Sequence, residues 1–502
     1  MLNSKRLIYA QPRGINRVRG MQSRMSREFR LTLLISLAHL PLGVLLYNAG
    51  SFAILHPIAA FSLGIVWAFQ KRTKLDRVAL VVAYLIGAEV LWRMAKIPVP
   101  WEFGKYGSAA IIFVALISRR SFKIPGLSLV YLLVLIPACI FPIIELNLSD
   151  ARQHISFTLS GPLLLGMSCW FFANVKTTPL RLRRLMFAIL VPLLSVAGAT
   201  LFYTVTAEDI YFNTESNFAT SGGFGPNQVS TMLGLGVFTA ACCLINFKLD
   251  AKFKIFLGIA AVFFAAQSVL TFSRGGIYTA VGACMALVCF QFRNVGEGIK
   301  RLVPILVLTA VFFWFVFPAL DNFTGGKLQE RFDDTGTSNR VEIAQSDFDM
   351  FFEYPIFGVG VGLADEYRRR LYGYGAGSHT EFSRLISEHG IFGIAALISL
   401  CSMAIVNFKR QQSTFGRTLI VGLSVWCVLF MINAGMRLAA PSYLWGMTFM
   451  TIVNFRRLRP KTQALMNSVK WNEKKSISQT GRLPIARNTN QSPKLVGRTG
   501  ER

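Results

Sequence analysis

Long apolar segments recur along almost the whole chain, and they constrain its fold more than any other feature. Most are about 17–20 residues long, which is the length that an α-helix needs to cross the hydrocarbon core of a bilayer. Of the 502 residues, 53% are apolar and only 16% are charged, whereas about a quarter of a soluble domain is charged. The sequence therefore predicts an all-α polytopic membrane protein.

We expect about 14 transmembrane helices, which divide the chain into five parts. The predicted spans are 31–48, 52–69, 77–92, 105–118, 126–144, 157–175, 185–206, 226–246, 253–272, 275–291, 302–320, 391–407, 418–433 and 440–455. The parts are a basic N-terminal segment (1–30), eleven spans (31–320), a large loop with short helices (321–390), three spans (391–455) and a basic tail (456–502). The tail has few apolar residues, so we expect it to be disordered. The segment 105–118 is short, and whether it crosses fully stays open.

The Lys and Arg residues predict which side of the membrane each connection occupies. With a cytoplasmic N-terminus, about three quarters of the 53 Lys and Arg residues fall in cytoplasmic segments, as the positive-inside rule requires. Both termini are then cytoplasmic, and the loop 321–390 lies outside the membrane on the other face. This distribution also explains the net charge of +28 without a nucleic-acid partner.

The N-terminus and the cysteines indicate neither a cleaved signal nor a metal framework. A basic segment precedes the apolar stretch 31–48, which has the character of a first span rather than of a signal peptide. All eight Cys residues lie in apolar stretches without metal-ligand spacing. We expect them to behave as small apolar residues.

The stretch GAGSHTEFSRLISEHG (375–390) is a polar segment between apolar ones. Ser378 and Glu381 have the spacing of a capping box, which predicts a helix that starts at His379 and ends before Gly390. At the first helical position the helix dipole disfavours imidazolium, so His379 is predicted to be neutral and able to accept a proton. An amphipathic surface helix with ordinary polar residues is an equally good interpretation.

Two arginines stand out for different reasons. Arg274, in TFSRGG, lies between two apolar segments with almost no loop between them. A charge at such a position is costly unless it has a function or a partner. Arg340, in TSNRVE, is expected to open a helix over 341–354, and taken alone it is an ordinary exposed arginine. The run of three arginines at 368–370 is most simply a solvated face.

Further polar residues lie at predicted span ends and in turns. Glu89 and Arg93 share a helix face and are expected to pair, as are Arg384 and Glu388. In the glycine turn EYPIFGVGVG (353–362), backbone N–H groups are able to cradle a phosphate, although an ordinary turn is the simpler interpretation. The residues expected to bind substrate are Glu388, Glu381, Gly360, Gly362, Asn227, Arg437, Glu89 and Arg93. Helix capping also explains Asn227, which follows a Gly/Pro turn.

Four segments in order resemble the O-antigen ligase and polysaccharide polymerase superfamily of bacterial inner membranes. They are GPNQVSTMLGLG (225–236), QSVLTFSRGG (267–276), SNRVEIAQ to YPIFGVGVG (338–362) and SHTEFSRLISEHGIFG (378–393). The resemblance covers roughly the C-terminal half. It implies a fold like that of C-type glycosyltransferases. The family residues tied to activity fall on Arg274, Arg340 and His379, with Glu388 matching a downstream acid. Many members have Asn after the His, where this chain has Thr380.

The resemblance implies a glycan donor carried on undecaprenyl pyrophosphate, and a glycan or lipid A core as acceptor, besides membrane lipids. Arginines suit the charge of a diphosphate leaving group, and a neutral His suits deprotonation of a sugar hydroxyl. We therefore predict an inverting glycosyltransferase with Arg274, Arg340 and His379 as catalytic residues. Asp347 and Asp349 form a DxD, but two residues apart in a helix do not share a face. We expect no metal and no cofactor.

Two questions stay open at the level of sequence. A transporter or flippase for lipid-linked glycans is the competing class, but such proteins tend to have internal repeats and polar groups at the bilayer midplane. Here the ionisable residues gather at span ends, which favours an enzyme. The sequence does not separate a polymerase, which joins glycan repeats, from a ligase, which transfers a finished chain; we favour a polymerase or a general surface-polysaccharide enzyme.

Overall fold

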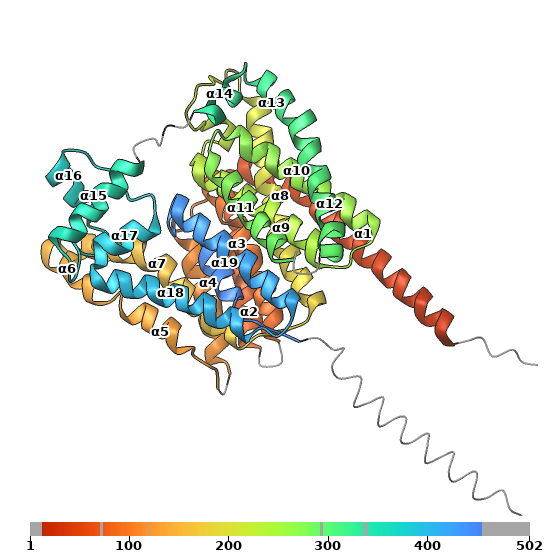
Figure 1. Cartoon of the computed structure of the whole chain (residues 1–502), viewed down its shortest axis with the longest axis horizontal. Coiled ribbons are helices and arrows are strands. Elements are labelled where there is room, and N and C mark those ends of the chain that lie inside the picture. The colour runs from red at the N-terminus through yellow and green to blue at the C-terminus, as the bar shows by residue number, and fades with distance from the viewer. Residues whose placement is uncertain are drawn as a thin grey trace, which may run out of the picture. The chain divides into compact units, whose positions relative to one another are not determined.

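The computed structural model describes residues 13–70, 74–119, 121–291, 295–334, 336 and 340–453 (Figure 1). Two units are distinguished, Met1–Ile452 and Val453–Arg502. All described helices and strands belong to the first. The predicted disordered tail (456–502) lies outside the described residues.

Helices make up nearly all of the regular structure in this unit. The α-helices are Arg13–Asn48 (α1), Leu55–Phe69 (α2), Leu75–Met94 (α3), Phe103–Ile117 (α4), Gly126–Leu133 (α5), Ile140–Glu145 (α6), Leu148–Ala173 (α7), Pro179–Thr206 (α8), Pro226–Asn246 (α9), Ala251–Leu270 (α10), Arg274–Gln291 (α11), Val295–Val311 (α12), Phe317–Phe323 (α13), Lys327–Asp333 (α14), Arg340–Glu353 (α15), Ala364–Tyr372 (α16), Glu381–His389 (α17), Ile391–Arg410 (α18), Thr414–Ala434 (α19) and Ala440–Met447 (α20). The minor elements are Gly50–Ile54 (η1), Pro137–Cys139 (η2), Ala219–Ser221 (η3), the π-helix Phe312–Val316 (η4) and the strands Lys176–Thr177 (β1) and Thr451–Ile452 (β2).

Ten helical segments among the described residues are long and apolar enough to cross a bilayer. They are 28–48, 50–69, 126–145, 148–173, 179–206, 226–246, 251–270, 302–323, 391–410 and 414–434. The prediction of an all-α polytopic membrane protein is thereby confirmed. Two of the other predicted spans correspond to shorter apolar helices, 103–117 and 274–290. The count of 14 and the orientation remain predictions.

The last predicted span, 440–455, is not a continuous helix. The helix α20 has eight residues, a rise of about 12 Å, and the chain then turns into β2. Thr451 of β2 pairs with Lys176 of β1 in a parallel two-stranded sheet. The side chain of Ser442 donates a hydrogen bond to the carbonyl of Gly161, 2.8 Å away, so α20 packs along α7 from the middle of that helix onward.

The first predicted span, 31–48, corresponds to the segment 28–48 of the structure, but the helix that contains it is longer than the span. The helix α1 begins at Arg13, well before the predicted start at residue 31, so much of the basic N-terminal segment is helical. A Pro at position 41 does not interrupt it.

Two glycines bring α9 and α11 into close contact at the centre of the bundle. A Cβ atom on Gly276 would collide with the carbonyl of Ser230, and one on Gly234 would collide with the carbonyl of Gly276. Small residues let helix backbones approach in this way inside membranes. The second glycine of the SRGG motif therefore has a packing role, and it fixes where α11 begins relative to α9.

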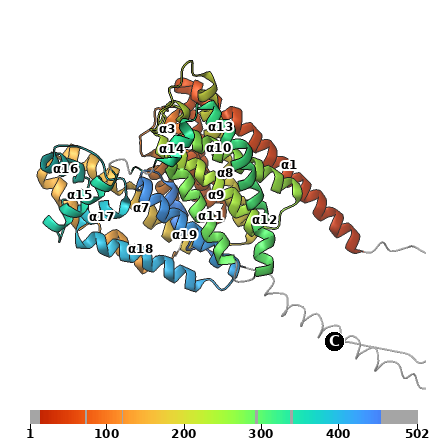
Figure 2. The same ribbon diagram turned by 45° about the horizontal axis from the view of Figure 1, so that its top comes forward.

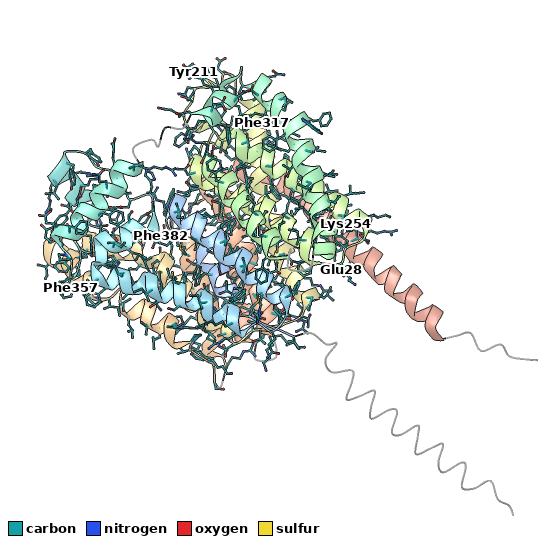
Figure 3. All side chains as sticks on the ribbon, viewed as in Figure 1. Glu28, Tyr211, Lys254, Phe317, Phe357 and Phe382 are labelled. Atoms are coloured by element: carbon teal, nitrogen blue, oxygen red, sulfur yellow. The ribbon has the colours of Figure 1, made fainter. Side chains whose placement is uncertain are left out.

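The large loop between α13 and α18 contains the four helices α14–α17. In Figures 1 and 2, α15, α16 and α17 lie together beside α18, and contacts within this group connect them. The helix α15 matches the predicted 341–354. In Figure 3 the labelled Phe382 belongs to α17, where it packs against the hydrophobic core of the bundle. The loop helices are thus anchored on the membrane helices.

Candidate active site

One cavity brings together the three predicted catalytic residues. It has a volume of about 1030 Å³, and Arg274, Arg340 and His379 all line it, together with Asn227. We call it the arginine cavity. These four residues are far apart in the sequence and come from four different elements. Their proximity meets a condition that the predicted catalytic roles require.

Four helices point their N-terminal ends at the arginine cavity. Asn227 lies in the first turn of α9, Arg274 and Arg340 are the first residues of α11 and α15, and Thr380 caps α17. Each helix N-terminus carries the positive end of a dipole. The convergence therefore adds a positive potential to that of the arginines, as in phosphate-binding sites.

Hydrogen bonds that they donate to uncharged oxygen atoms hold the two predicted arginines. The guanidinium of Arg274 donates to the backbone carbonyls of Asp334 and Gly336, the latter at 3.0 Å. Arg340 donates to the side-chain oxygen of Asn433 on α19. A Cβ on Gly275 would collide with this Asn433 amide, which explains the first glycine of SRGG.

Sequence analysis missed a third arginine at this site, Arg331 of α14. It donates to the carbonyl of Phe272 at 3.1 Å. Phe272 has a positive φ of 58°, a strained conformation for a bulky residue, so the tight turn before Arg274 presents its carbonyl to Arg331. Arg331 had no signal in the sequence, because an Arg in a short polar helix is usually solvated.

The arginine cavity carries excess positive charge. Among the described residues its lining includes three arginines but only two acidic side chains, Glu215 and Asp334. Burial, followed by the charges of Arg274 and Arg331, lowers the pKa of Arg340. Such mutual repulsion in a partly buried site is relieved by binding an anion.

His379 has a different local position from the one predicted. Thr380 is the N-cap of α17, because its hydroxyl accepts from the N–H of Ser383 at 3.0 Å, and Ser378 is not the cap. His379 thus precedes the helix instead of opening it. Burial, followed by the charges of Arg340 and Arg437, lowers the pKa of His379 from 6.5 to about 4. The imidazole is neutral as predicted, but the cause is mainly burial.

Asn227 also differs from the prediction, because Gly225 and not Asn227 precedes α9 as its cap residue. The Asn227 side-chain oxygen accepts from the hydroxyl of Ser273 at 2.6 Å. This bond ties the start of α9 to the turn that carries Arg274.

A buried ion pair holds the segment that contains His379. Arg368 and Asp347 are both fully buried and bond to each other. Arg368 also donates to the carbonyl of Ala376, and Asp347 accepts from Ser378 at 2.9 Å and from Ser383 at 2.6 Å. The prediction of a solvated face is wrong for Arg368. Asp347 thus has a structural role in the loop.

Four of the residues predicted to bind substrate line a second, smaller cavity of about 310 Å³ next to the first. They are Glu381, Glu388, Gly362 and Arg437. We call it the mixed-charge cavity. Arg384 bonds to both Glu381 and Glu388, the latter at 2.7 Å, so the predicted Arg384–Glu388 pair is present.

The glycine turn is packed against protein. Gly358, Gly360 and Gly362 all have positive φ angles, which glycine adopts without strain. The N–H of Gly360 donates to the carbonyl of Glu388 at 3.2 Å, and the N–H of Val359 to that of Ser387 at 2.9 Å. The turn therefore positions α17, and these N–H groups are not available to a phosphate.

Glu89 and Arg93 line a third cavity of about 230 Å³. They pair at 2.6 Å, as predicted. Glu89 also accepts from the N–H of Ala439 at 2.8 Å, and Arg93 donates to the carbonyl of Arg437 at 3.2 Å. Both side chains thereby fix the turn before α20. This structural role is the alternative to the predicted substrate binding.

These observations first define a class: a multi-pass helical membrane protein with a cationic cavity between the ends of its membrane helices and its loop helices. Comparison with known proteins shows a likeness to one family. The family model described as O-antigen ligase matches residues 259–398, which include Arg274, Arg340 and His379. The match confirms the resemblance to the O-antigen ligase and polymerase superfamily, and it supports a role in surface-glycan assembly. A search of curated proteins found no match.

We predict that Asp347→Ala destabilises the loop helices, because it leaves the Arg368 charge buried without a partner. Breaking a buried ion pair on one side costs about 3–5 kcal/mol. Thermal unfolding and limited proteolysis of the purified protein measure the effect. Asp349→Ala is the matched control, since Asp349 contacts Tyr372 at the surface. Equal stability of the two variants would contradict the role of the ion pair.

Proposed function

We propose that the protein transfers a glycan from an undecaprenyl-pyrophosphate donor to a sugar hydroxyl of an acceptor in bacterial surface-polysaccharide assembly. The observation that carries the proposal is the arginine cavity, where two arginines of the matched segment, a third arginine and a neutral imidazole meet. Four helix N-termini add to its positive potential. A diphosphate is the ligand whose charge and size suit this set of donors.

An apolar groove beside the arginine cavity suits the lipid part of such a donor. Its volume is about 460 Å³, and apolar side chains of α9, α10, α11 and α12 line it. The helix α11 contributes to both places, with Ile277 and Val281 in the groove and Arg274 and Tyr278 in the cavity. An amphipathic ligand with an anionic head and a long apolar tail fits this arrangement.

The proposed reaction is a single displacement at the anomeric carbon of the donor. The acceptor oxygen forms a bond to this carbon while the bond from the carbon to the pyrophosphate oxygen breaks. His379 accepts the hydroxyl proton, and Arg274 and Arg340 stabilise the charge on the leaving undecaprenyl pyrophosphate. The configuration of the carbon inverts. The products are the extended glycan and the lipid diphosphate.

Donor binding also makes His379 a better base in this mechanism. In the free protein the arginines help to keep the pKa of His379 low. A bound diphosphate brings negative charge to the same cavity, which favours the protonated imidazole. The imidazole therefore gains basicity when the donor is present, and unproductive protonation of the free enzyme is avoided.

The further parts of the proposal concern location and metal use. The loop helices and the arginine cavity lie on the periplasmic face of the inner membrane, both termini are cytoplasmic, and the fold is of the C-type glycosyltransferase kind. Among the described residues no group of three or more His, Cys, Asp or Glu side chains is placed to hold a metal ion. We propose that the arginines take the role that metal ions have elsewhere in diphosphate chemistry.

We predict that His379→Ala, Arg274→Ala and Arg340→Ala each abolish glycan assembly in a deletion strain, although each variant inserts normally. Loss of a general base lowers the rate by about 10²–10⁴-fold. Gel analysis of the surface glycan is the readout. Shortened chains on deletion indicate the polymerase that we favour, whereas intact but unattached chains indicate a ligase.

Arg370→Ala is the matched control for these variants, since Arg370 is exposed and pairs with Glu366. Normal glycan from correctly inserted His379→Ala protein would contradict the proposal. With the purified enzyme, EDTA should leave the rate unchanged, and inhibition that added divalent metal reverses would contradict metal independence.

We predict that the acid limb of the pH–rate profile differs between free and donor-bound enzyme. For kcat/KM, which reports the free enzyme, activity is lost as pH falls through about 4, because His379 must be neutral and its pKa is lowered to about 4. For kcat, which reports the donor-bound enzyme, the acid limb lies at higher pH, because the bound diphosphate favours the protonated imidazole. In Arg340→Gln, NMR titration of the His379 imidazole should show a pKa raised above about 4, because one of the charges that lower it is removed. A limb near 6.5 in the unaltered free enzyme would contradict the account.

A further inference from the structure

We propose that the mixed-charge cavity is a binding site for a neutral saccharide, which presents the acceptor hydroxyl to His379. This inference rests on the proposed function and deepens it. The charges of the two cavities differ. The lining of the mixed-charge cavity includes three cationic and three acidic side chains, so it has no formal excess, whereas the arginine cavity has an excess of positive charge among the described residues.

The ionic groups of the mixed-charge cavity are largely paired, either with one another or with residues outside its lining. Arg384 is bonded to Glu381 and Glu388, and Lys105 is paired with Glu102 at 2.5 Å. A charged ligand would have to displace these pairs. An uncharged, hydroxyl-rich ligand can bond to their remaining lone pairs and protons without breaking them.

Three groups in this cavity are suited to a sugar ring. His154 donates from Nδ1 to the carbonyl of Gly362 at 2.9 Å, which leaves its Nε2 as an acceptor. The Oδ1 atom of Asp365 is buried and has no hydrogen-bond partner among the described residues. The ring of Phe157, which is 49% exposed, offers an apolar face. Two acceptors and an aromatic ring match the hydroxyls and the C–H face of a sugar.

The position of this cavity relative to His379 suits the acceptor instead of the donor. Ser378 lines the mixed-charge cavity and the next residue, His379, lines the arginine cavity. Arg437 lines the mixed-charge cavity and donates to the carbonyl of Ser378 at 3.4 Å. In a displacement, the nucleophile and the leaving group lie on opposite sides of the anomeric carbon. Because adjacent residues of the segment before α17 line the two cavities, a saccharide in one and a diphosphate in the other would both lie close to His379.

The test uses two probes on the full-length protein in nanodiscs. One is undecaprenyl pyrophosphate, and the other is the set of oligosaccharides released from the surface polysaccharide of the strain that carries the protein. Saturation-transfer NMR should show saturable oligosaccharide binding in the presence of saturating undecaprenyl pyrophosphate. Phe157→Ala and Asp365→Ala should each weaken this binding by about tenfold, as expected from the loss of one good contact. Binding of undecaprenyl pyrophosphate should be unchanged.

Matched controls are Phe113→Ala, an exposed Phe on α4, and Glu366→Ala, a half-buried acid next to Asp365 that pairs with Arg370 outside the cavity lining. Both should bind the oligosaccharides as the parent protein does. Three results would overturn the inference. They are no oligosaccharide binding, displacement of the oligosaccharides by undecaprenyl pyrophosphate, or an equal loss of affinity for both probes in the cavity variants. His379→Ala should keep both binding reactions, so normal glycan assembly by that variant would refute the proposed function separately.

Discussion

The candidate active site depends on the mutual repulsion of three partly buried arginines, which an anionic ligand relieves. Arg274, Arg331 and Arg340 share one cavity, and helix N-termini add to their positive potential. Carbonyl and amide oxygens hold these side chains, and Asp334 adds a carboxylate 3.6 Å from Arg331. The protein thus keeps a concentration of positive charge that an anionic ligand would stabilise.

The loop helices and the membrane helices complete the site together. Neither part contains all three arginines and the imidazole. The buried pair of Arg368 and Asp347 fixes the segment before α17, and the glycine turn at 358–362 bonds to the end of the same helix. Because His379 lies between these two anchors, its position relative to Arg274 is set by contacts outside the cavity itself.

Sequence predicted those features that follow from apolar length and from local pairing. The ten segments that can span a membrane, the helix after Arg340 and the Arg384–Glu388 pair are examples. Features that depend on tertiary contacts were missed. An Arg in a run of three looks solvated unless its buried partner is known, and the segment 440–455 looks like a span although α20 ends at Met447.

The candidate site also combines features that the local sequence predicts with features that depend on tertiary contacts. The sequence and the family resemblance identified Arg274, Arg340 and His379 as candidates. They did not give the correct reason why the imidazole of His379 is neutral. Ser378 has the spacing of a cap, yet Asp347 and Arg368 engage its side chain, and Thr380 caps the helix instead. The other predicted binding residues fall mostly in separate cavities. No local pattern separates a carboxylate that contacts a ligand from one that, like Glu89, bonds to a distant turn.

The most direct test of the central claim is a cryo-EM structure of the full-length protein with undecaprenyl pyrophosphate. The account predicts density for the diphosphate in the arginine cavity, with its oxygens about 3 Å from the guanidinium groups of Arg274 and Arg340. The lipid chain should follow the groove between α9 and α12. Density for the diphosphate in the mixed-charge cavity, or at a place without either arginine, would contradict the account.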